Sequence, residues 1–589
     1  QVQVLGMPVT TVRQTNNPSV LNQTLRQVGA NTKKIAPVAT LADAQDLAAE
    51  IGFPIVVRAV APVAGSFRRI VHDQADLQPA VTAAIQHSGI HQAMIQQSLA
   101  GLKEIEVVVA RDQSGTMMQL AVAEDLDPIG IHAGDSVTVL PAQTLLDRQI
   151  QDMRDVAFKI TRKLRVVGIN HVQFALDQAN DRFYVIKNSP YLDRLTTFVE
   201  QATGYPLARV HGNLVAGQLL RDLRLDHGLV KHTAAMEPVL DRTAIRLPVF
   251  ANEQLGIGDR PLTTEKQSVG AVIGLGRSLV EALLKALSEL HLDFFALREV
   301  ADEQLDQLLI HPRANRLLAV LEALRRGYLL PELSELTRLD PFYLAQFKRL
   351  VGLERDLMQH PGDLTFLQQA KYWGMSDFLI GQIWQESAAT VRQLRQDHQL
   401  HRTYKELDPS AGELDQHPAK FYSTFEQVNE SQVGDRPRAL VIGAGPRRLG
   451  NGVTTDYLLT RVAAELKRQG YDLVVIDNNP NSALLNRELA SKCYLEPRDF
   501  ERVAAVVALE QPEVIASADC SFVADFPLVR AGAATLIKLP PLALPTLKDG
   551  VTYQYNAFFD GRYAYPLGIT RLTQASAGVT VDFAPDLPA

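Results

Sequence analysis

The sequence predicts a multidomain protein in which α/β and α+β regions lie on either side of an all-helical region. Its 589 residues are too many for one hydrophobic core, so roughly two to four domains are expected. Short β-branched runs alternate with amphipathic segments up to about residue 302, and leucine then recurs at helical spacing to about residue 400. A strand–helix–strand rhythm follows from about residue 435. These three changes of pattern predict the fold class.

The first region, residues 1–302, contains strand-like runs at residues 54–58 (PIVVR) and 105–110 (IEVVVA). Both are short and rich in β-branched residues, which favour pleated sheets. Amphipathic segments separate such runs along the whole region. An α/β or α+β domain is therefore expected.

The second region, residues 303–434, loses the strand signal. Leucines at 317, 318, 321 and 324 repeat at helical spacing, and residues 344–353 place apolar side chains on one face of a further helix. This predicts an all-helical domain with a buried face made by Leu344, Phe347, Leu350, Val351 and Leu353. A polar connector with several Pro and Gly breakers, residues 408–437, ends the region.

The third region, residues 435–545, opens with a strand-like run at 438–442 followed by Gly443, Ala444 and Gly445. A helix through residue 466 and a second strand at 473–476 complete the rhythm of a parallel sheet. A small Rossmann-like unit is expected here. The tail, residues 546–589, is too short for a full domain.

The composition excludes several classes of protein. Hydrophobic residues make up 46% and charged residues 21%, and no run approaches the roughly 20 apolar residues of a membrane helix. The net charge of −7, with both signs interspersed, gives no basic stripe for a nucleic acid. Cys493 and Cys520 are the only cysteines, and no secretory leader pattern is present. A cytoplasmic protein without membrane or nucleic-acid partners is predicted.

Several long motifs occur in the first region. Residues 126–145 read LDPIGIHAGDSVTVLPAQTL, and they are joined by GLKEIE at 101–106, ATGYPLA at 202–208 and TTEKQSVG at 263–270. LHRTYK at 400–405, FYSTFE at 421–426 and GAGPRRLGNG at 443–452 follow in order. This series resembles the large chain of carbamoyl-phosphate synthase, a member of the ATP-grasp class.

The resemblance implies four segments. Residues 1–302 would be the ATP-grasp domain of a first synthetase half without its leading subdomain, and residues 303–434 a helical oligomerisation domain. Residues 435–545 would be the Rossmann-like pre-ATP-grasp domain of a second half, and residues 546–589 a remnant of its ATP-grasp part. The family forms carbamoyl phosphate from bicarbonate and ammonia with ATP, for arginine or pyrimidine biosynthesis. A glutaminase small chain, another synthase chain or a second copy of this chain are the partners implied.

The resemblance also implies a nucleotide site. Arg58 stands where the family places a phosphate-contacting arginine, and Glu104 and His132 stand where it places contacts to the nucleotide. In place of the family's run of glycines, residues 62–69 read PVAGSFRR and keep only Gly65, with Arg68 or Arg69 as possible anion contacts. The full set of nucleotide positions is Arg58, Gly65, Leu99, Glu104, Gly130, Ile131, His132 and Gln173.

The metal ligands implied by the family are mostly replaced. The family's Glu-x-Asn-Pro-Arg motif reads Lys187-Asn188-Ser189-Pro190-Tyr191 here, and Gln97 replaces an acidic residue at the nucleotide. Only Gln173 survives from the magnesium ligand set. Lys187 puts a cation where a divalent ion would lie, and two such charges about 4 Å apart repel by several kcal/mol at an intermediate dielectric. Lys187 could instead touch a phosphate, which would favour nucleotide binding over phosphoryl transfer.

Each of these positions also has an ordinary structural interpretation. Arg58 could be a solvated strand end, Glu104 a surface partner of Lys103, and His132 a histidine satisfied by loop backbone. The Gly443 motif is interpreted as a structural loop rather than a dinucleotide fingerprint because Pro446 interrupts it. Both cysteines are expected to be structural.

Three functional hypotheses follow from the sequence. The chain is an active synthase large chain, a decayed paralogue that binds a nucleotide or a partner chain, or a remnant without function. No catalytic residue is assigned, and ATP is the expected cofactor with Mg²⁺ impaired. The loss of metal ligands argues against catalysis by this chain alone, and the apolar face kept in the helical region favours the second hypothesis, a pseudoenzyme with a binding or regulatory role.

Overall fold

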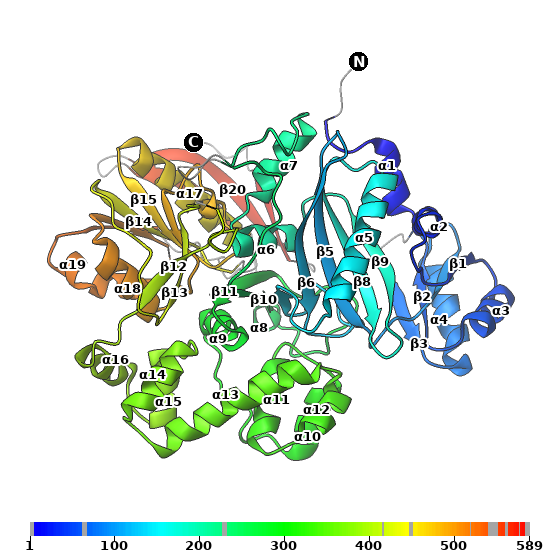
Figure 1. Cartoon of the computed structure of the whole chain (residues 1–589), viewed down its shortest axis with the longest axis horizontal. Coiled ribbons are helices and arrows are strands. Elements are labelled where there is room, and N and C mark those ends of the chain that lie inside the picture. Colours follow the sequence, from blue (N-terminus) through cyan, green and yellow to red (C-terminus); the bar gives the residue numbers. More distant parts are fainter. Residues whose placement is uncertain are drawn as a thin grey trace. The chain divides into compact units, whose positions relative to one another are not determined.

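The computed structural model describes residues 5–61, 67–225, 232–414, 417–446, 452–518, 520–539, 552–559, 564–575 and 578–583. The chain forms two compact units, Gln1–Pro540 and Pro541–Ala589. The first unit contains a small antiparallel sheet, a larger sheet, a helical region and a mostly parallel sheet in chain order (Figure 1). The fold class is therefore the multidomain α/β and α+β class with a helical region that the sequence predicts.

The small sheet has four antiparallel strands in the order β1-β4-β2-β3. Two helices pack on it, and their N-termini are capped by the side chains of Thr40 and Asp73. Ile55, Val57 and Ile95 are among the buried side chains of its core. Its elements are β1 (Ile35–Val38), α3 (Leu41–Ile51), β2 (Ile55–Ala59), β3 (Arg68–Val71), α4 (Gln74–Gln86) and β4 (Ala93–Gln97). The preceding helices α1 (Val9–Asn16) and α2 (Pro18–Gln27) pack instead with the larger sheet, since Leu21 and Leu25 belong to its core.

The larger sheet has seven strands in the order β11-β10-β7-β6-β5-β8-β9, and every neighbouring pair is antiparallel. Its elements are β5 (Lys103–Arg111), β6 (Met117–Asp125), β7 (Thr138–Leu140), α5 (Asp147–Lys163), β8 (Gly168–Asp177), β9 (Arg182–Ser189), α6 (Arg194–Thr203), α7 (Leu207–Val215), β10 (Thr243–Val249), α8 (Asn252–Leu255), β11 (Gly270–Gly276) and α9 (Leu279–Glu289).

Strand β5 shows how this sheet divides its two faces. Ile105, Val107 and Val109 pack in one core with α5, whereas Val108 and Ala110 pack in another core with α6. Because side chains alternate along a strand, Glu104 and Glu106 lie on the same face as Val108. Two carboxylates are thereby placed on the face away from α5.

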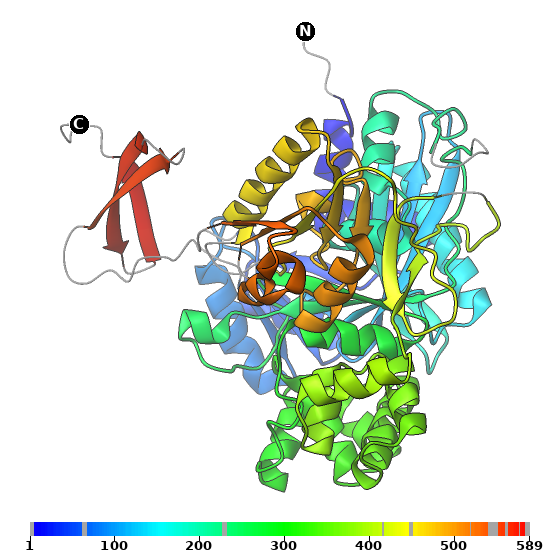
Figure 2. The same cartoon turned by 90° about the vertical axis from the view of Figure 1, so that its left-hand side faces the viewer.

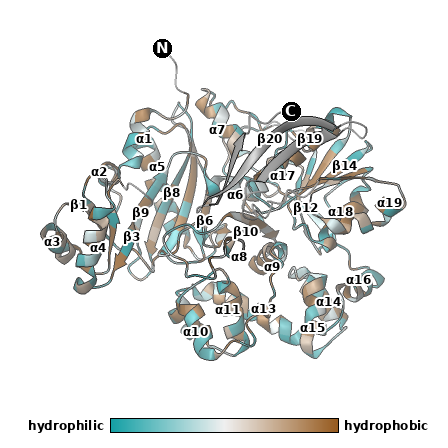
Figure 3. Ribbon diagram, turned by 180° about the vertical axis from the view of Figure 1, so that it is seen from behind, coloured by the Kyte–Doolittle hydropathy of each residue, from teal (hydrophilic) through white to brown (hydrophobic). Residues whose placement is uncertain are grey.

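Seven helices form the middle region, and the predicted face of Leu344, Phe347, Leu350, Val351 and Leu353 is buried. Figure 3 shows hydrophobic and hydrophilic residues on the same helices, as expected where each helix has one apolar face. The helices are α10 (Asp302–Ile310), α11 (Arg316–Arg325), α12 (Leu330–Thr337), α13 (Pro341–Gln359), α14 (Leu364–Tyr372), α15 (Asp377–Trp384) and α16 (Ala388–Asp397).

The third sheet has the order β12-β13-β16-β15-β14-β17-β18, and all neighbouring pairs except β12 with β13 are parallel. Cys493 is buried in it, and burial raises the pKa of its thiol to about 11, as expected of a structural cysteine. The elements are β12 (Thr403–Glu406), β13 (Lys420–Thr424), β14 (Arg438–Ile442), α17 (Gly452–Arg468), β15 (Asp472–Ile476), η1 (Ala483–Leu485), β16 (Lys492–Tyr494), α18 (Phe500–Glu510), β17 (Val514–Ser517), η2 (Ser521–Asp525), α19 (Pro527–Arg530) and β18 (Thr535–Lys538).

The second unit is an antiparallel sheet in the order β19-β20-β21 (Figure 2). Its strands are β19 (Thr552–Phe559), β20 (Ala564–Ala575) and β21 (Gly578–Phe583). Within the described parts of both units, no helix combines the length and the apolar character needed to cross a bilayer.

Candidate functional site

Three cationic side chains gather at the small sheet. Arg58 on β2 lies directly opposite Arg68 on β3, and Lys33 lies just before β1. Burial, together with the charges of Arg68 and Arg58, lowers the pKa of Lys33 to about 8. Burial and the charge of Arg68 also lower the pKa of Arg58, whose buried Nε has no hydrogen-bond partner among the described residues. We call Lys33, Arg58 and Arg68 the phosphate cluster because like charges held this close favour a bound anion.

Within the described residues, no member of the phosphate cluster forms an ion pair with a carboxylate. The interpretation of Arg58 as a solvated strand end does not account for its buried, unpartnered nitrogen. Gly65 lies outside the described residues, so its predicted role stays a prediction. Phe67, next to that segment, stacks on His87 with ring centroids 5.2 Å apart.

Three carboxylates lie together at the centre of the larger sheet. Oxygens of Glu104 and Glu106 on β5 and of Asp125 on β6 all lie within 4.8 Å of one another, and all three residues are buried. We call them the site carboxylates. Gln173 Nε2 and Arg194 donate to Glu106 Oε1 at 2.7 and 2.8 Å. Glu106 is therefore neutralised by a cation, whereas the other two carboxylates form no ion pair in the described part of the chain.

The charge states of the site carboxylates differ accordingly. Burial and the charge of Glu106 raise the pKa of Glu104 to about 8, and burial and the same charge raise the pKa of Asp125 well above its ordinary value. Burial opposes ionisation of Glu106 too, but Arg194 and His171 hold its pKa below the ordinary value. At neutral pH, Glu104 is therefore mostly protonated unless a cation joins it, and the same causes disfavour the charged form of Asp125.

The positions implied as metal ligands lie on β8 and β9, where Gln173 pairs with Lys187 in the strand register. Lys187 is exposed, and its charge lowers the pKa values of Glu104 and His132. Ser189 Oγ is buried and has no hydrogen-bond partner in the described part of the chain, and Asn188 Oδ1 already accepts from Asn170 at 2.9 Å. An ammonium cannot replace a carboxylate as a ligand of Mg²⁺, and the Ser189 hydroxyl offers a single neutral oxygen in place of the amide oxygen.

Two loops bring the remaining predicted residues together. The amide of Ile129 donates to the carbonyl of Leu102, and the amide of Gly101 donates to the carbonyl of Ile129. These bonds place Leu99 beside the loop that holds Gly130, Ile131 and His132, and Gly130 has a φ of +133°. A left-handed φ of this kind favours glycine over residues with a Cβ.

The contacts of His132 and Lys103 can be compared with the ordinary structural interpretations of His132 and Glu104. His132 Nδ1 accepts from the amide of Gly134 at 2.9 Å, so loop backbone does satisfy part of this ring. Burial and the charge of Arg194 lower its pKa to about 4, which leaves it neutral at pH 7. The pairing of Glu104 with Lys103 is wrong, because Lys103 binds Asp340 at 2.6 Å instead. Gln97 lies at the end of β4, where its amide donates to the carbonyl of Lys34 at 2.8 Å.

Sequence reasoning missed Glu106, Asp125 and Arg194. Glu106 carried a usable signal, because it follows Glu104 by two residues within one strand. Arg194 begins α6, which is capped by Asp193, and Asp193 also binds His171 Nδ1 at 2.7 Å. Asp125 reaches the site only through the pairing of β6 with β5, which no local pattern reveals.

Three family models match the chain in order. Residues 19–223 match the carbamoyl-phosphate synthase L chain, ATP binding domain, and residues 271–399 match the carbamoyl-phosphate synthetase large chain, oligomerisation domain. Residues 435–518 match the carbamoyl phosphate synthase preATP-grasp domain. The matched order is the one that the sequence motifs predict.

Solved structures also resemble the chain at a distance. The biotin carboxylase domain of the Hydrogenobacter thermophilus 2-oxoglutarate carboxylase, with MgADP, ADP and bicarbonate, is 16% identical with a TM-score of 0.36, and the match covers 45% of this chain and 60% of that chain. A Campylobacter jejuni biotin carboxylase β,γ-ATP complex is 15% identical with a TM-score of 0.40, and the match covers 56% of this chain and 76% of that chain. N5-carboxyaminoimidazole ribonucleotide synthetase from Thermotoga maritima is 18% identical with a TM-score of 0.35, and the match covers 48% of this chain and 72% of that chain.

Proposed function

Because this chain belongs to the carbamoyl-phosphate synthase large-chain family, we propose that its first region binds ATP and neutralises the phosphates mainly with its own cations. Residues 1–302, 303–434, 435–545 and 546–589 are the proposed domains. Phosphoryl transfer to bicarbonate, the reaction implied by the family, is proposed to be weak or lost. The observation that carries this proposal is the replacement of the family's metal ligands by Lys187 and Ser189 while Arg58, Glu104 and His132 are retained.

The phosphate cluster supports the binding half of the proposal. Lys33, Arg58 and Arg68 have lowered pKa values, which means that each would gain stabilisation from an anion. A polyphosphate supplies that anion, and guanidinium groups bind its oxygens with two parallel hydrogen bonds. The cluster therefore suits the phosphate end of a nucleotide.

The loop of Leu99 and the loop of Ile131 and His132, which are joined by backbone hydrogen bonds, support the proposed binding of the nucleoside part of ATP. Leu99 and Ile131 are buried apolar residues, and neutral His132 offers a polar edge next to them. Nucleoside pockets in general combine apolar walls with a few fixed polar groups. Glu104, protonated at neutral pH, can donate as well as accept a hydrogen bond there.

The position of Lys187 supports the proposal that ATP binds to this chain without Mg²⁺. It is exposed, forms no ion pair within the described residues, and acts electrostatically on Glu104 and His132 from its place opposite Gln173. An ammonium there can contact a phosphate oxygen, but it repels a divalent ion. Phosphoryl transfer relies on a metal that orients and neutralises the transferred group, so binding should outlast catalysis.

The site carboxylates favour a second candidate, an enzyme with a displaced metal site. Glu104, Glu106 and Asp125 bring hard oxygen donors within 4.8 Å of one another, and Mg²⁺ prefers such donors. Against this, Arg194 already binds Glu106 at 2.8 Å, and its charge also acts on Glu104. The charge of Arg194 therefore already neutralises much of the negative charge that would attract a divalent ion.

The deciding experiment is titration with ATP in the presence of Mg²⁺ and in the presence of EDTA. We expect ATP to bind at least as tightly in EDTA, and we expect no bicarbonate-dependent ATP hydrolysis. The double variant Lys187→Glu with Ser189→Asn should make binding depend on Mg²⁺. Lys159→Glu, which makes the same charge change on the exposed side of α5, is the matched control. Mg²⁺-dependent binding and turnover by the unmodified chain would favour the second candidate.

Association with other chains is a further part of the proposal. The matched oligomerisation model covers residues 271–399, so a glutaminase small chain, a synthase chain or a second copy of this chain would dock on the helical region. A cytoplasmic setting, with two reduced cysteines, suits such partners. Light scattering of the purified chain tests self-association directly, and copurification tests the glutaminase chain.

A further inference from the structure

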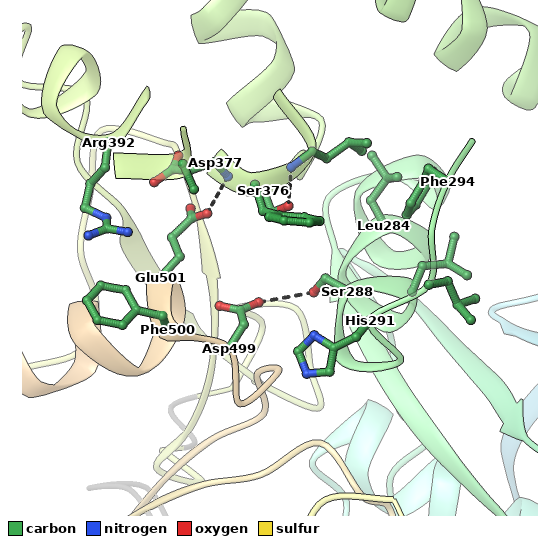
Figure 4. Close-up of a pocket in the computed structure, with 15 residues that line it drawn as sticks. Leu284, Ser288, His291, Phe294, Ser376, Asp377, Arg392, Asp499, Phe500 and Glu501 are labelled. Carbon is green, nitrogen blue, oxygen red and sulfur yellow. Dashed lines mark hydrogen bonds between the residues drawn. The ribbon is translucent and has the colours of Figure 1, made fainter. Parts of the chain in front are cut away.

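A cavity of about 300 Å³ lies where the larger sheet, the helical region and the parallel sheet meet within the first unit (Figure 4). Helix α9 supplies Leu284 and Leu287, α15 supplies Leu379, and α18 supplies Phe500. None of these residues belongs to the candidate nucleotide site. The cavity walls are therefore built from three regions that are far apart in sequence.

The cavity has an apolar interior of a size that suits a small organic molecule. Leu284, Leu287 and Leu379 are at most 3% exposed, and Phe294 is 7% exposed. Phe378 also lines the cavity and is 61% exposed, so an aromatic surface is presented to solvent at this place. Small-molecule sites are typically concave and apolar with a few fixed polar groups, and this volume is at the lower end of their range.

The acidic groups of the lining are already neutralised. Asp377 and Glu501 both bind Lys371, at 2.8 and 2.7 Å, and Asp499 pairs with Arg502. Ser288 donates to Asp499 at 3.3 Å, as the dashed line in Figure 4 marks. These carboxylates have little remaining attraction for a cationic ligand.

Arg392 differs from the other charged groups of the lining. Its guanidinium lies 4.3 Å from the centre of the Phe500 ring, and it forms no ion pair with any described carboxylate. Its Nε is buried and has no hydrogen-bond partner among the described residues. A buried donor without a partner is costly, and an anion would satisfy both the donor and the charge.

We propose that this cavity binds a small apolar carboxylate, with its aromatic or branched aliphatic body among the leucines and its carboxylate on Arg392. Such a ligand would contact α9 beside the larger sheet, the helical region and the parallel-sheet region at once. Binding to the folded state should therefore raise the midpoint of thermal unfolding as ligand concentration increases.

The test uses 3-phenylpropionate as the probe and 3-phenylpropylamine as its matched amine, both titrated against the full chain by saturation-transfer difference NMR. We expect the carboxylate to bind and the amine to bind at least about tenfold more weakly, since a charge-assisted hydrogen bond contributes roughly 1.5–3 kcal/mol. Arg392→Gln should weaken 3-phenylpropionate by a similar factor. Equal binding of the two probes, or no binding of 3-phenylpropionate at millimolar concentration, would overturn the proposal.

A second pair of variants locates the probe. Ala388 lines the cavity at the start of α16, and the next residue, Ala389, is exposed and does not line it. Ala388→Phe should fill the cavity and abolish binding, whereas Ala389→Phe should leave binding unchanged. Excess ATP should not displace the probe, because the phosphate cluster lies elsewhere. Undiminished binding by Ala388→Phe, or displacement by ATP, would assign the probe to another site.

Discussion

Two groups of buried charged residues differ in how completely their polar atoms are hydrogen-bonded. At the junction of the helical region and the parallel sheet, Lys371, Asp377, Arg395, Arg402 and Glu501 form what we call the junction cluster. None of its buried polar atoms lacks a hydrogen-bond partner in the part of the chain that the structure describes. At the candidate nucleotide site, by contrast, Glu106 Oε2, Asp125 Oδ2 and Arg58 Nε have none.

The difference indicates what each group of charges does. Lys371 donates to Met375 O, Asp377 and Glu501 at 2.7–2.8 Å, so its charge is used within the folded chain. The site charges keep unused capacity, and buried charge without a partner is costly unless a ligand meets it. The junction cluster should therefore govern stability, and the site should govern binding.

The largest expected effect is on the junction cluster. Lys371→Met removes a fully buried ammonium and leaves Asp377 and Glu501 short of a partner. We expect the free energy of unfolding to fall by about 3–5 kcal/mol, measured by urea denaturation. Lys348→Met, an exposed lysine on α13, should change it by no more than about 0.5 kcal/mol. A similar small loss in both variants would contradict the proposed role of the cluster.

The next effect is on ATP binding. Arg58→Gln should weaken ATP by about tenfold or more, as expected for the loss of a charge-assisted contact of roughly 1.5–3 kcal/mol, without lowering the free energy of unfolding. Arg69→Gln is the matched control, because alternation along β3 directs Arg69 to the opposite face from Arg68. Calorimetric titration with ATP measures the affinity of each of the two variants. Equal loss in the two variants would show that the phosphates lie elsewhere.

A third effect concerns pH. The pKa of Glu104 is raised to about 8 in the folded chain, so its contribution to stability is complete below the ordinary carboxyl pKa of about 4.5 and is lost as pH rises through 8. Glu104→Gln should therefore lose less stability than the unmodified chain between pH 5 and 8, by on the order of 1 kcal/mol. Urea denaturation at both pH values measures the difference. Parallel pH profiles for the two proteins would exclude the raised pKa.

The smallest expected effect is on Lys187, which is exposed and therefore screened by solvent. Lys187→Gln should weaken ATP in EDTA by only about threefold at low salt, and the loss should diminish as ionic strength rises. The control is Lys159→Gln on α5. A stronger interaction of Mg²⁺-ATP in Lys187→Gln than in the unmodified chain would agree with electrostatic exclusion of the metal. A loss that does not depend on salt would contradict it.

The sequence by itself determined the order of the regions and the family. Motifs such as residues 126–145 and the leucine spacing of the helical region are local, so the chain carries them without reference to its neighbours. The buried face of Leu344, Phe347 and Leu350 was predictable for the same reason, because helical periodicity fixes which side chains share a face.

Only the tertiary structure decided which charges meet. Arg58 and Arg68 lie opposite each other because β2 and β3 pair, Asp125 joins Glu106 because β6 pairs with β5, and Arg194 arrives from α6. The cavity beside Arg392 likewise depends on helices from three regions. Charge states and cavities depend on burial and on long-range neighbours, and a linear pattern of residues records neither of them.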